Sequence, residues 1–193
     1  MMRGDQVAIW SQDKYLKAWN YASAAHHGQC ITKSSDIPYI NHIGLVAMEA
    51  VAACSESSSI ENPDLLIACA LLHDTIEDTD CTVEMLEATF GADVAQGVLA
   101  LSKDGTLPSK REQMLDSLKR IKAQPQEIWM VKVCDRITNL QPPPKHWTPE
   151  KIANYREEAQ LILNALGSSH AGLAKRLAIK IDDYAQYVGK SSL

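Results

Sequence analysis

The sequence predicts an all-α fold, a single compact helical bundle of about eight to ten helices over residues 1–193. Two observations support this prediction. Apolar residues recur at the 3.6-residue spacing of an amphipathic helix along most of the chain, and the breaks between these segments carry helix-capping residues. A length of 193 residues also suits one hydrophobic core, since cores commonly hold together up to a couple of hundred residues.

The first half of the chain predicts helices over residues 11–27, over residues 39–54 and from Asn62 onward. The first should bury Tyr15, Leu16, Trp19 and Ala22, which recur at spacings near 3.6. The third has a clear start, because asparagine caps helix N-termini and proline tolerates the first helical position. Its apolar run continues to Leu72 and directly into a cluster of ionisable residues.

The second half predicts six further helices, each with its own boundary residue. Thr82 should cap a short helix that Gly91 closes, and residues 92–101 should form the next. Three prolines then open helices: Pro108 to about residue 123, Pro125 to about residue 140, and Pro149, after the cap Thr148, to residue 166. A last helix should follow the glycine at residue 167 and reach residue 188.

Composition and charge exclude several classes of protein. Hydrophobic residues make up 46% of the chain, yet no apolar run approaches the roughly 20 residues that span a bilayer. The N-terminal segment lacks the apolar core of a signal peptide, and the five cysteines form no Cys-x-x-Cys pair. We therefore expect a cytoplasmic protein without disulfides. A net charge of -5 argues against nucleic acid as a partner, but a small phosphorylated ligand remains compatible.

The string His73-Asp74-Thr75-Ile76-Glu77-Asp78 is the first candidate site. On a continuous helix, His73 with Glu77 and Asp74 with Asp78 would each share one face. Four such groups at the end of a buried helix are costly to desolvate unless something pairs them, and a divalent cation would do so. An isolated His-Asp pair is more often a core histidine beside a helix stop, but the whole cluster favours a site.

Two further segments supply side chains that could meet this cluster. In residues 132–139, helical spacing puts Lys132, Asp135 and Asn139 on one stripe. His42 falls in the first turn of an apolar helix and alone would more often be structural. Two imidazoles and two carboxylates together suit a hard or borderline divalent ion with open positions for water, such as manganese or iron, better than a closed zinc site. A metal lowers the pKa of a bound water, and Glu77 and Asp78 could move its proton.

Three motifs resemble the HD-domain phosphohydrolases, and more specifically the hydrolase domain of RelA/SpoT-type proteins. They are Pro-Tyr-Ile-Asn-His at residues 38–42, Leu-Leu-His-Asp-Thr-Ile-Glu-Asp-Thr at residues 71–79 and Lys-Val-Cys-Asp-Arg-Ile-Thr-Asn at residues 132–139. Ala-His-His-Gly-Gln at residues 25–29 also fits. The chain stops where the larger members continue into a synthetase domain, so it looks like the stand-alone small alarmone hydrolases.

The resemblance implies a fold of the HD type and removal of the 3′-pyrophosphate from guanosine tetra- or pentaphosphate, with one manganese ion as cofactor. It also implies roles for eleven residues. The metal ligands would be His42, His73, Asp74 and Asp135. The catalytic pair would be Glu77 and Asp78. The residues that contact the nucleotide and its phosphates would be Lys33, Lys132, Arg136, Asn139 and Tyr155.

One departure from the family pattern concerns the base. The family usually carries an arginine that packs against the purine in the loop before Pro38, where this chain has Thr32. Threonine lacks the planar charged face of arginine, so adenosine 3′-pyrophosphates are a second candidate substrate. Two alternatives stay open: an HD phosphatase acting on other nucleotides or deoxynucleotides, and a nucleotide-binding regulatory module without catalysis. The sequence does not determine the oligomeric state.

Overall fold

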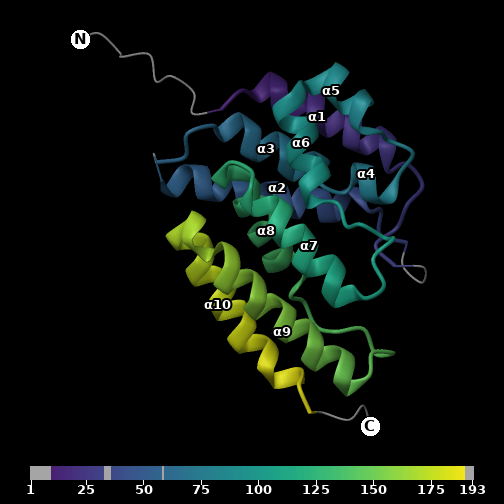
Figure 1. The fold of residues 1–193 in the computed structure, drawn as a ribbon, viewed down its shortest axis with the longest axis vertical. Helices are drawn as coiled ribbons and strands as arrows, with labels where there is room; N and C mark the ends of the chain where they lie inside the picture. Colours follow the sequence, from purple (N-terminus) through teal and green to yellow (C-terminus); the bar gives the residue numbers. More distant parts are fainter. Residues whose placement is uncertain (1–9, 33–35, 58, 190–193) are drawn as a thin grey trace.

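The structure is a computed structural model that describes residues 10–32, 36–57 and 59–189. Within these ranges it contains ten α-helices, two short 3-10 helices and no strand, which confirms the all-α prediction (Figure 1). The helices are α1 (Gln12–Ala25), α2 (Ile40–Glu56), α3 (Pro63–Leu72), α4 (Thr75–Asp78), α5 (Val83–Phe90), α6 (Ala92–Leu101), α7 (Lys110–Lys122), α8 (Gln126–Asn139), α9 (Pro149–Leu166), η1 (Gly167–Ser169), α10 (Ala171–Tyr184) and η2 (Ala185–Tyr187).

Helix α3 lies at the centre of the fold. It contacts α1, α2, α6 and α8, and every residue from Leu65 to Leu72 is buried. Asn62 caps it by accepting a hydrogen bond from the amide of Leu65, and Pro63 begins it, as the sequence predicted. Helix α8 contacts α2 and α3 and also α9 and α10, which lie toward the C-terminal end of the molecule (Figure 1). Helix α3 therefore has both α2 and α8 as neighbours.

The predicted contact face of α1 was wrong in one residue. Leu16 is 55% exposed, whereas Ala18 and Ala22 are completely buried and Tyr15 and Trp19 are half-buried. Helix α1 packs closely on α3, and two alanines allow that approach because their side chains are small. The helix is rotated toward this small face, which leaves Leu16 in solvent.

The predicted continuous helix through His73 and Asp78 was also wrong. Helix α3 ends at Leu72, and Asp74 has φ -102° and ψ 0°, outside the helical region. The hydroxyl of Thr75 donates to the carbonyl of Leu72 at 2.7 Å. The last carbonyls of a helix have no amide partner within the helix, and here a side-chain hydroxyl supplies the hydrogen bond. Because of this break, Glu77 and Asp78 follow on the separate helix α4 and do not continue the faces of His73 and Asp74.

The other predicted helices are present with small shifts at their ends. Gly91 adopts φ +91° between α5 and α6, a conformation that glycine accepts without steric cost. Helix α7 begins two residues after Pro108 with Ser109 as its cap, and His170 caps α10. Among the helices of the described residues, none has the length and apolar character needed to cross a membrane.

Candidate metal centre and catalytic residues

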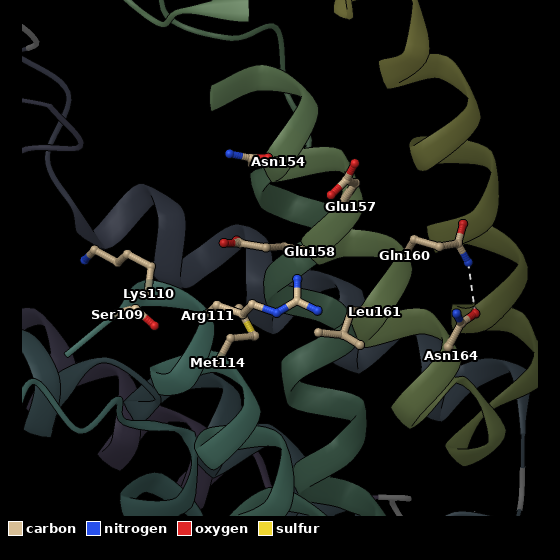
Figure 2. Close-up of a pocket in the computed structure, with 10 residues that line it drawn as sticks. All are labelled: Ser109, Lys110, Arg111, Met114, Asn154, Glu157, Glu158, Gln160, Leu161 and Asn164. Carbon is tan, nitrogen blue, oxygen red and sulfur yellow. Dashed lines mark hydrogen bonds between the residues drawn. The ribbon is translucent and has the colours of Figure 1, made fainter. Parts of the chain in front are cut away.

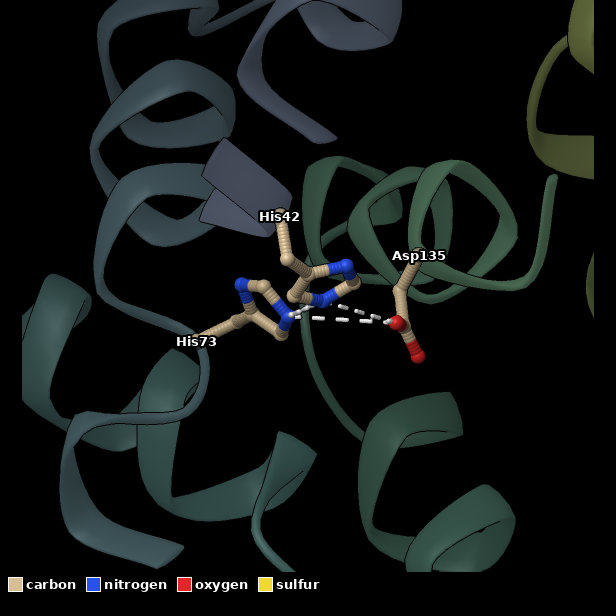
Figure 3. Close-up of side chains that lie close together, drawn as sticks. All are labelled: His42, His73 and Asp135. Atoms are coloured by element: carbon tan, nitrogen blue, oxygen red, sulfur yellow. Dashed lines mark hydrogen bonds and ion pairs between the residues drawn. The ribbon is translucent and has the colours of Figure 1, made fainter. Parts of the chain in front are cut away.

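Three buried side chains from three helical segments meet at one point (Figure 3). His42 comes from the first turn of α2, His73 from the residue after α3, and Asp135 from the last half of α8. The two Nε2 atoms are 3.4 Å apart, and the Asp135 Oδ1 lies 3.6 Å from His42 Nε2 and 3.9 Å from His73 Nε2. One ligand atom from each residue lies within 4.8 Å of the others. This spacing fits a shared metal ion.

Asp74 lies beside the two histidines of this cluster. Its Oδ2 is 3.0 Å from the Nε2 of His73 and 3.6 Å from that of His42. The same oxygen accepts a hydrogen bond of 2.5 Å from the hydroxyl of Tyr39, the residue just before α2. The structure therefore brings together all four residues that the sequence proposed as ligands, with Tyr39 orienting one of them.

Neighbouring groups hold the ligands in a form that can bind a cation. The Nδ1 of His73 lies 2.8 Å from the carbonyl of Ala70, so Nδ1 keeps its proton as a donor to that carbonyl. Nε2, which faces the cluster, is then the nitrogen that can bind a metal once it has lost its own proton. Asp135 accepts hydrogen bonds from the Lys132 ammonium at 3.1 Å and from the Asn139 amide at 2.5 Å. A donor set of two imidazoles and two carboxylates with oriented partners fits a divalent ion.

The electrostatics of the cluster keep both carboxylates ionised. Burial raises the pKa of Asp74, but His73, His42 and Tyr39 outweigh burial and hold it well below its usual value. Burial acts likewise on Asp135, where Lys132 and His73 lower the pKa. Two buried anions that face two imidazoles have a strong affinity for positive charge, whether it is a proton or a metal ion.

We predict from the same balance that metal affinity rises with pH. In metal-free protein, burial lowers the pKa of His73, but Asp74 and Asp135 outweigh it and raise the pKa from 6.5 to about 9. A metal ion must displace that proton, so affinity should rise by up to about tenfold per pH unit through this window and level off above it. Protonated His73 also stabilises the metal-free fold, and this contribution depends on pH in the opposite direction to the metal affinity. It is fully present below pH 6.5 and is lost as the pH rises through about 9.

Calorimetric titration of chelator-treated protein with Mn²⁺ at several pH values between 6.5 and 9 measures this dependence. The heats should also report release of about one proton per ion when buffers of different ionisation enthalpy are compared. A metal affinity that does not change over this range would contradict the proposed role of His73.

The proposed catalytic pair lies at the surface on α4. Both oxygens of Glu77 contact Lys103: Oε1 accepts from the ammonium at 2.8 Å and Oε2 from the backbone amide at 2.9 Å. The pKa of Asp78 is raised by partial burial and by the charges of Asp74 and Glu77. The surroundings of the two carboxylates therefore differ: Glu77 is paired with a cation, and Asp78 holds a proton more readily than an ordinary aspartate.

The five residues proposed for substrate contact have separate locations. Lys132 and Asn139 contact Asp135, as described above, and Lys132 is buried. Arg136 lies over the ring of Tyr155, 4.3 Å from its centre, and its Nη2 is 3.4 Å from a Glu158 oxygen. The remaining nitrogens of Arg136, Nε and Nη1, are buried and have no hydrogen-bond partner among the described residues. Lys33 lies outside the described residues.

A hollow of about 640 Å³ lies between α7 and α9 (Figure 2). Lys110 and Arg111 line its α7 side, and Glu157 and Glu158 line its α9 side. Glu158 also contacts Arg136, so this hollow adjoins the Arg136–Tyr155 pair. A ligand in it would meet charged groups of both signs.

The structure adds three residues that sequence reasoning did not assign to the site. Tyr39 belongs to the motif at residues 38–42, but nothing in its spacing indicates that its hydroxyl reaches Asp74. Lys103 lies between two predicted helices, where no sequence pattern marks it, although it is the first cation after α6. Gln29 donates to the backbone carbonyl of Asp78 at 2.7 Å and contacts His26 Nδ1 at 2.7 Å, which explains the Ala-His-His-Gly-Gln string.

An all-helical fold with paired imidazoles, carboxylates and a second acidic pair defines the class of helical phosphohydrolases. A profile of the HD domain matches residues 18–179, and the chain belongs to the HD-domain family.

Three comparisons support this membership. The chain is 32% identical over 167 residues to guanosine-3′,5′-bis(diphosphate) 3′-pyrophosphohydrolase MESH1 of Danio rerio, with 84% of this chain and 89% of that protein covered. It is 36% identical over 129 residues to the bifunctional (p)ppGpp synthase/hydrolase SpoT of Escherichia coli, which covers 64% of this chain and 17% of that longer protein. A solved structure described as a metazoan ortholog of SpoT that hydrolyses ppGpp superposes with a TM-score of 0.74 at 25% identity, covering 94% of this chain and 99% of that one.

Proposed function

We propose that this protein hydrolyses the 3′-pyrophosphate of guanosine tetra- and pentaphosphate with manganese as its cofactor, giving GDP or GTP and pyrophosphate. The observation that carries the proposal is the meeting of His42, His73 and Asp135 at one point, with Asp74 beside both histidines. Relatives that share about 30% identity over most of the chain are named as enzymes of this reaction, which supports the choice of substrate.

His42, His73, Asp74 and Asp135 would hold the cation. A divalent ion held by these four residues would supply a Lewis acid for a phosphoryl oxygen and would lower the pKa of water, so that water could act as a nucleophile at neutral pH. Lys132 and Asn139 act on the site through Asp135, because both donate to its carboxylate. Tyr39 acts through Asp74 in the same way. Burial and the charge of Asp74 raise the pKa of Tyr39, so its hydroxyl stays a donor throughout the working pH range.

Glu77 and Asp78 would manage the protons of the reaction. Glu77 takes the proton from the attacking water, and Asp78, whose pKa is raised, holds a proton for the leaving oxygen of the nucleoside. A raised pKa suits a general acid, because it brings the pKa of the group closer to the operating pH. Arg136 and Tyr155, with Lys33, would contact the nucleotide beyond the reacting phosphate.

A panel of nucleotides tests this function against the nearest alternative, an HD phosphatase for ordinary nucleotides. Manganese-loaded protein should cleave guanosine 3′-pyrophosphates with a kcat/KM at least about 100-fold above that for any deoxynucleoside triphosphate, a difference of roughly 2.7 kcal/mol. Faster cleavage of deoxynucleotides would favour the phosphatase. Tight binding of the alarmone without turnover would favour a regulatory module.

We predict that base recognition in this enzyme is loose. Thr32 stands where the family's arginine packs on the purine, and threonine offers no planar cation for stacking. Guanosine and adenosine 3′-pyrophosphates should then be cleaved with kcat/KM values within about tenfold, or roughly 1.4 kcal/mol. Thr32→Arg should lower the KM of both purines, and Lys33→Ala should raise both KM values together. Steady-state kinetics on the two substrates measure these effects, and a thousandfold preference for guanine in the wild type would contradict the prediction.

A further inference from the structure

Lys103 binds Glu77 through two independent groups. Its ammonium reaches one carboxylate oxygen at 2.8 Å, and its own backbone amide reaches the other at 2.9 Å. If the ammonium moved away, the amide would still hold the carboxylate in place. Lysine suits such an exchange because its charge sits on a flexible four-carbon stem. The side chain of Lys103 is 35% exposed, which leaves it free to move.

The backbone at Lys103 is fixed by Arg120 on α7. The Arg120 guanidinium donates to the carbonyls of Leu99, Ala100 and Ser102, at 2.6, 3.2 and 2.7 Å, and these carbonyls belong to the end of α6 and the residue after it. Asp116 pairs with Arg120 at 2.7 Å. Cations stabilise helix C-termini in this way. The segment that carries Lys103 is therefore held firmly beside α4 while its side chain is not.

Charge also concentrates at this point. Burial lowers the pKa of Lys103, but Glu77, Asp135 and Asp74 outweigh burial and raise it, so the ammonium lies in the field of the metal-site carboxylates. A hollow of about 730 Å³ opens here, and its lining includes Glu77, Lys103, Asp104, Lys110 and Arg120. Arg120 is engaged with Asp116 and the carbonyls above, which leaves Lys103 and Lys110 as the cations that a ligand in the hollow can meet.

We propose that this hollow is the subsite for the 3′-pyrophosphate of the substrate. When that pyrophosphate binds, the ammonium of Lys103 moves from Glu77 to it. The transfer frees one oxygen of Glu77 while the backbone amide of Lys103 keeps the carboxylate oriented. Phosphate binding and the release of the catalytic carboxylate are thereby coupled. A lysine ammonium is well suited to this role, since it meets phosphate oxygens as a point charge without a fixed geometry.

The inference rests on the proposed function for its choice of ligand, but binding can be tested without turnover. The probe is inorganic pyrophosphate, titrated calorimetrically into manganese-loaded full-length protein, with a blank titration into buffered Mn²⁺ to correct for chelation. The variants are Lys103→Met, which removes the charge, and Lys103→Arg, which keeps it. Lys14→Met is the matched control, because Lys14 forms an ion pair of 2.6 Å with Asp64, between α1 and α3. Thermal melting of each variant checks that the fold is intact.

Lys103→Met should weaken pyrophosphate binding by about tenfold or more, the effect of losing one charge-assisted contact, while Lys103→Arg and Lys14→Met stay within about threefold of the wild type. A wild type that does not bind pyrophosphate, or a Lys103→Met variant that binds it with less than about a fivefold loss, would overturn the inference. The failure of the proposed function would be seen differently, as a metal-loaded wild type that binds pyrophosphate through Lys103 but cleaves no guanosine 3′-pyrophosphate.

Discussion

Replacing Asp74 with alanine is expected to lower the affinity for Mn²⁺ by about 100-fold or more and to abolish measurable turnover. Asp74 Oδ2 lies within 3.6 Å of both histidine Nε2 atoms, so its loss removes a ligand and one of the two anions that attract the cation. Metal content after desalting, measured by inductively coupled plasma mass spectrometry, reports the first effect. Initial rates with guanosine tetraphosphate report the second.

Two variants separate this effect from general damage. Tyr39→Phe removes only the hydroxyl that donates to Asp74, so it should keep most of the metal and lose at most about 100-fold in activity, as expected for a group that orients a ligand. Asp182→Ala changes an exposed carboxylate on α10 and should match the wild type in both measurements. Full metal occupancy in Asp74→Ala would exclude Asp74 as a ligand.

Replacing Glu77 with glutamine should reduce kcat by about two to four orders of magnitude, the usual contribution of a positioned general base. Glutamine keeps the shape of the side chain and an oxygen that can still accept the amide of Lys103, but it cannot take a proton. The KM should not rise, because the substitution leaves the metal site and Arg136 untouched and removes the charge that holds the Lys103 ammonium. Single-turnover kinetics with metal-loaded protein measure the chemical step directly.

The control for this experiment is Glu87→Gln, the same substitution on an exposed face of α5, which should leave kcat unchanged. If Glu77→Gln hydrolysed the substrate at the wild-type rate, another group would have to accept the proton. Asp78 would then be the group to test, since it lies next to Glu77 on α4.

The capping residues explain why most helices could be predicted from the sequence. Asn62, Thr82 and Thr148 each accept a hydrogen bond from a backbone amide at a helix start, and side chains of this kind act locally, within three residues. Ser109 does the same for α7, although the sequence had indicated Pro108 as the start of that helix. The stripe of Lys132, Asp135 and Asn139 was equally predictable, because it depends on the period of a single helix, and both hydrogen bonds to Asp135 confirm it.

Features that depend on packing between helices could not be read from one sequence. The break after Leu72 is made by Thr75 and His73 bonding back to the end of α3, and the string of residues alone was compatible with one unbroken helix. The exposure of Leu16 follows from how closely α1 lies on α3. Lys103 meets Glu77 across 26 residues because Arg120 fixes the intervening segment, a long-range contact with no local signal.

Analysis of the products by ³¹P nuclear magnetic resonance shows most directly whether the protein removes the 3′-pyrophosphate. After manganese-loaded protein has acted on guanosine tetraphosphate, we expect equal amounts of GDP and intact pyrophosphate, with the 3′-phosphorus resonances of the substrate lost. In ¹⁸O-labelled water the label should enter the pyrophosphate and not the GDP, because attack occurs at the phosphorus attached to the 3′-oxygen. Release of orthophosphate in place of pyrophosphate, or label in the nucleoside product, would contradict it.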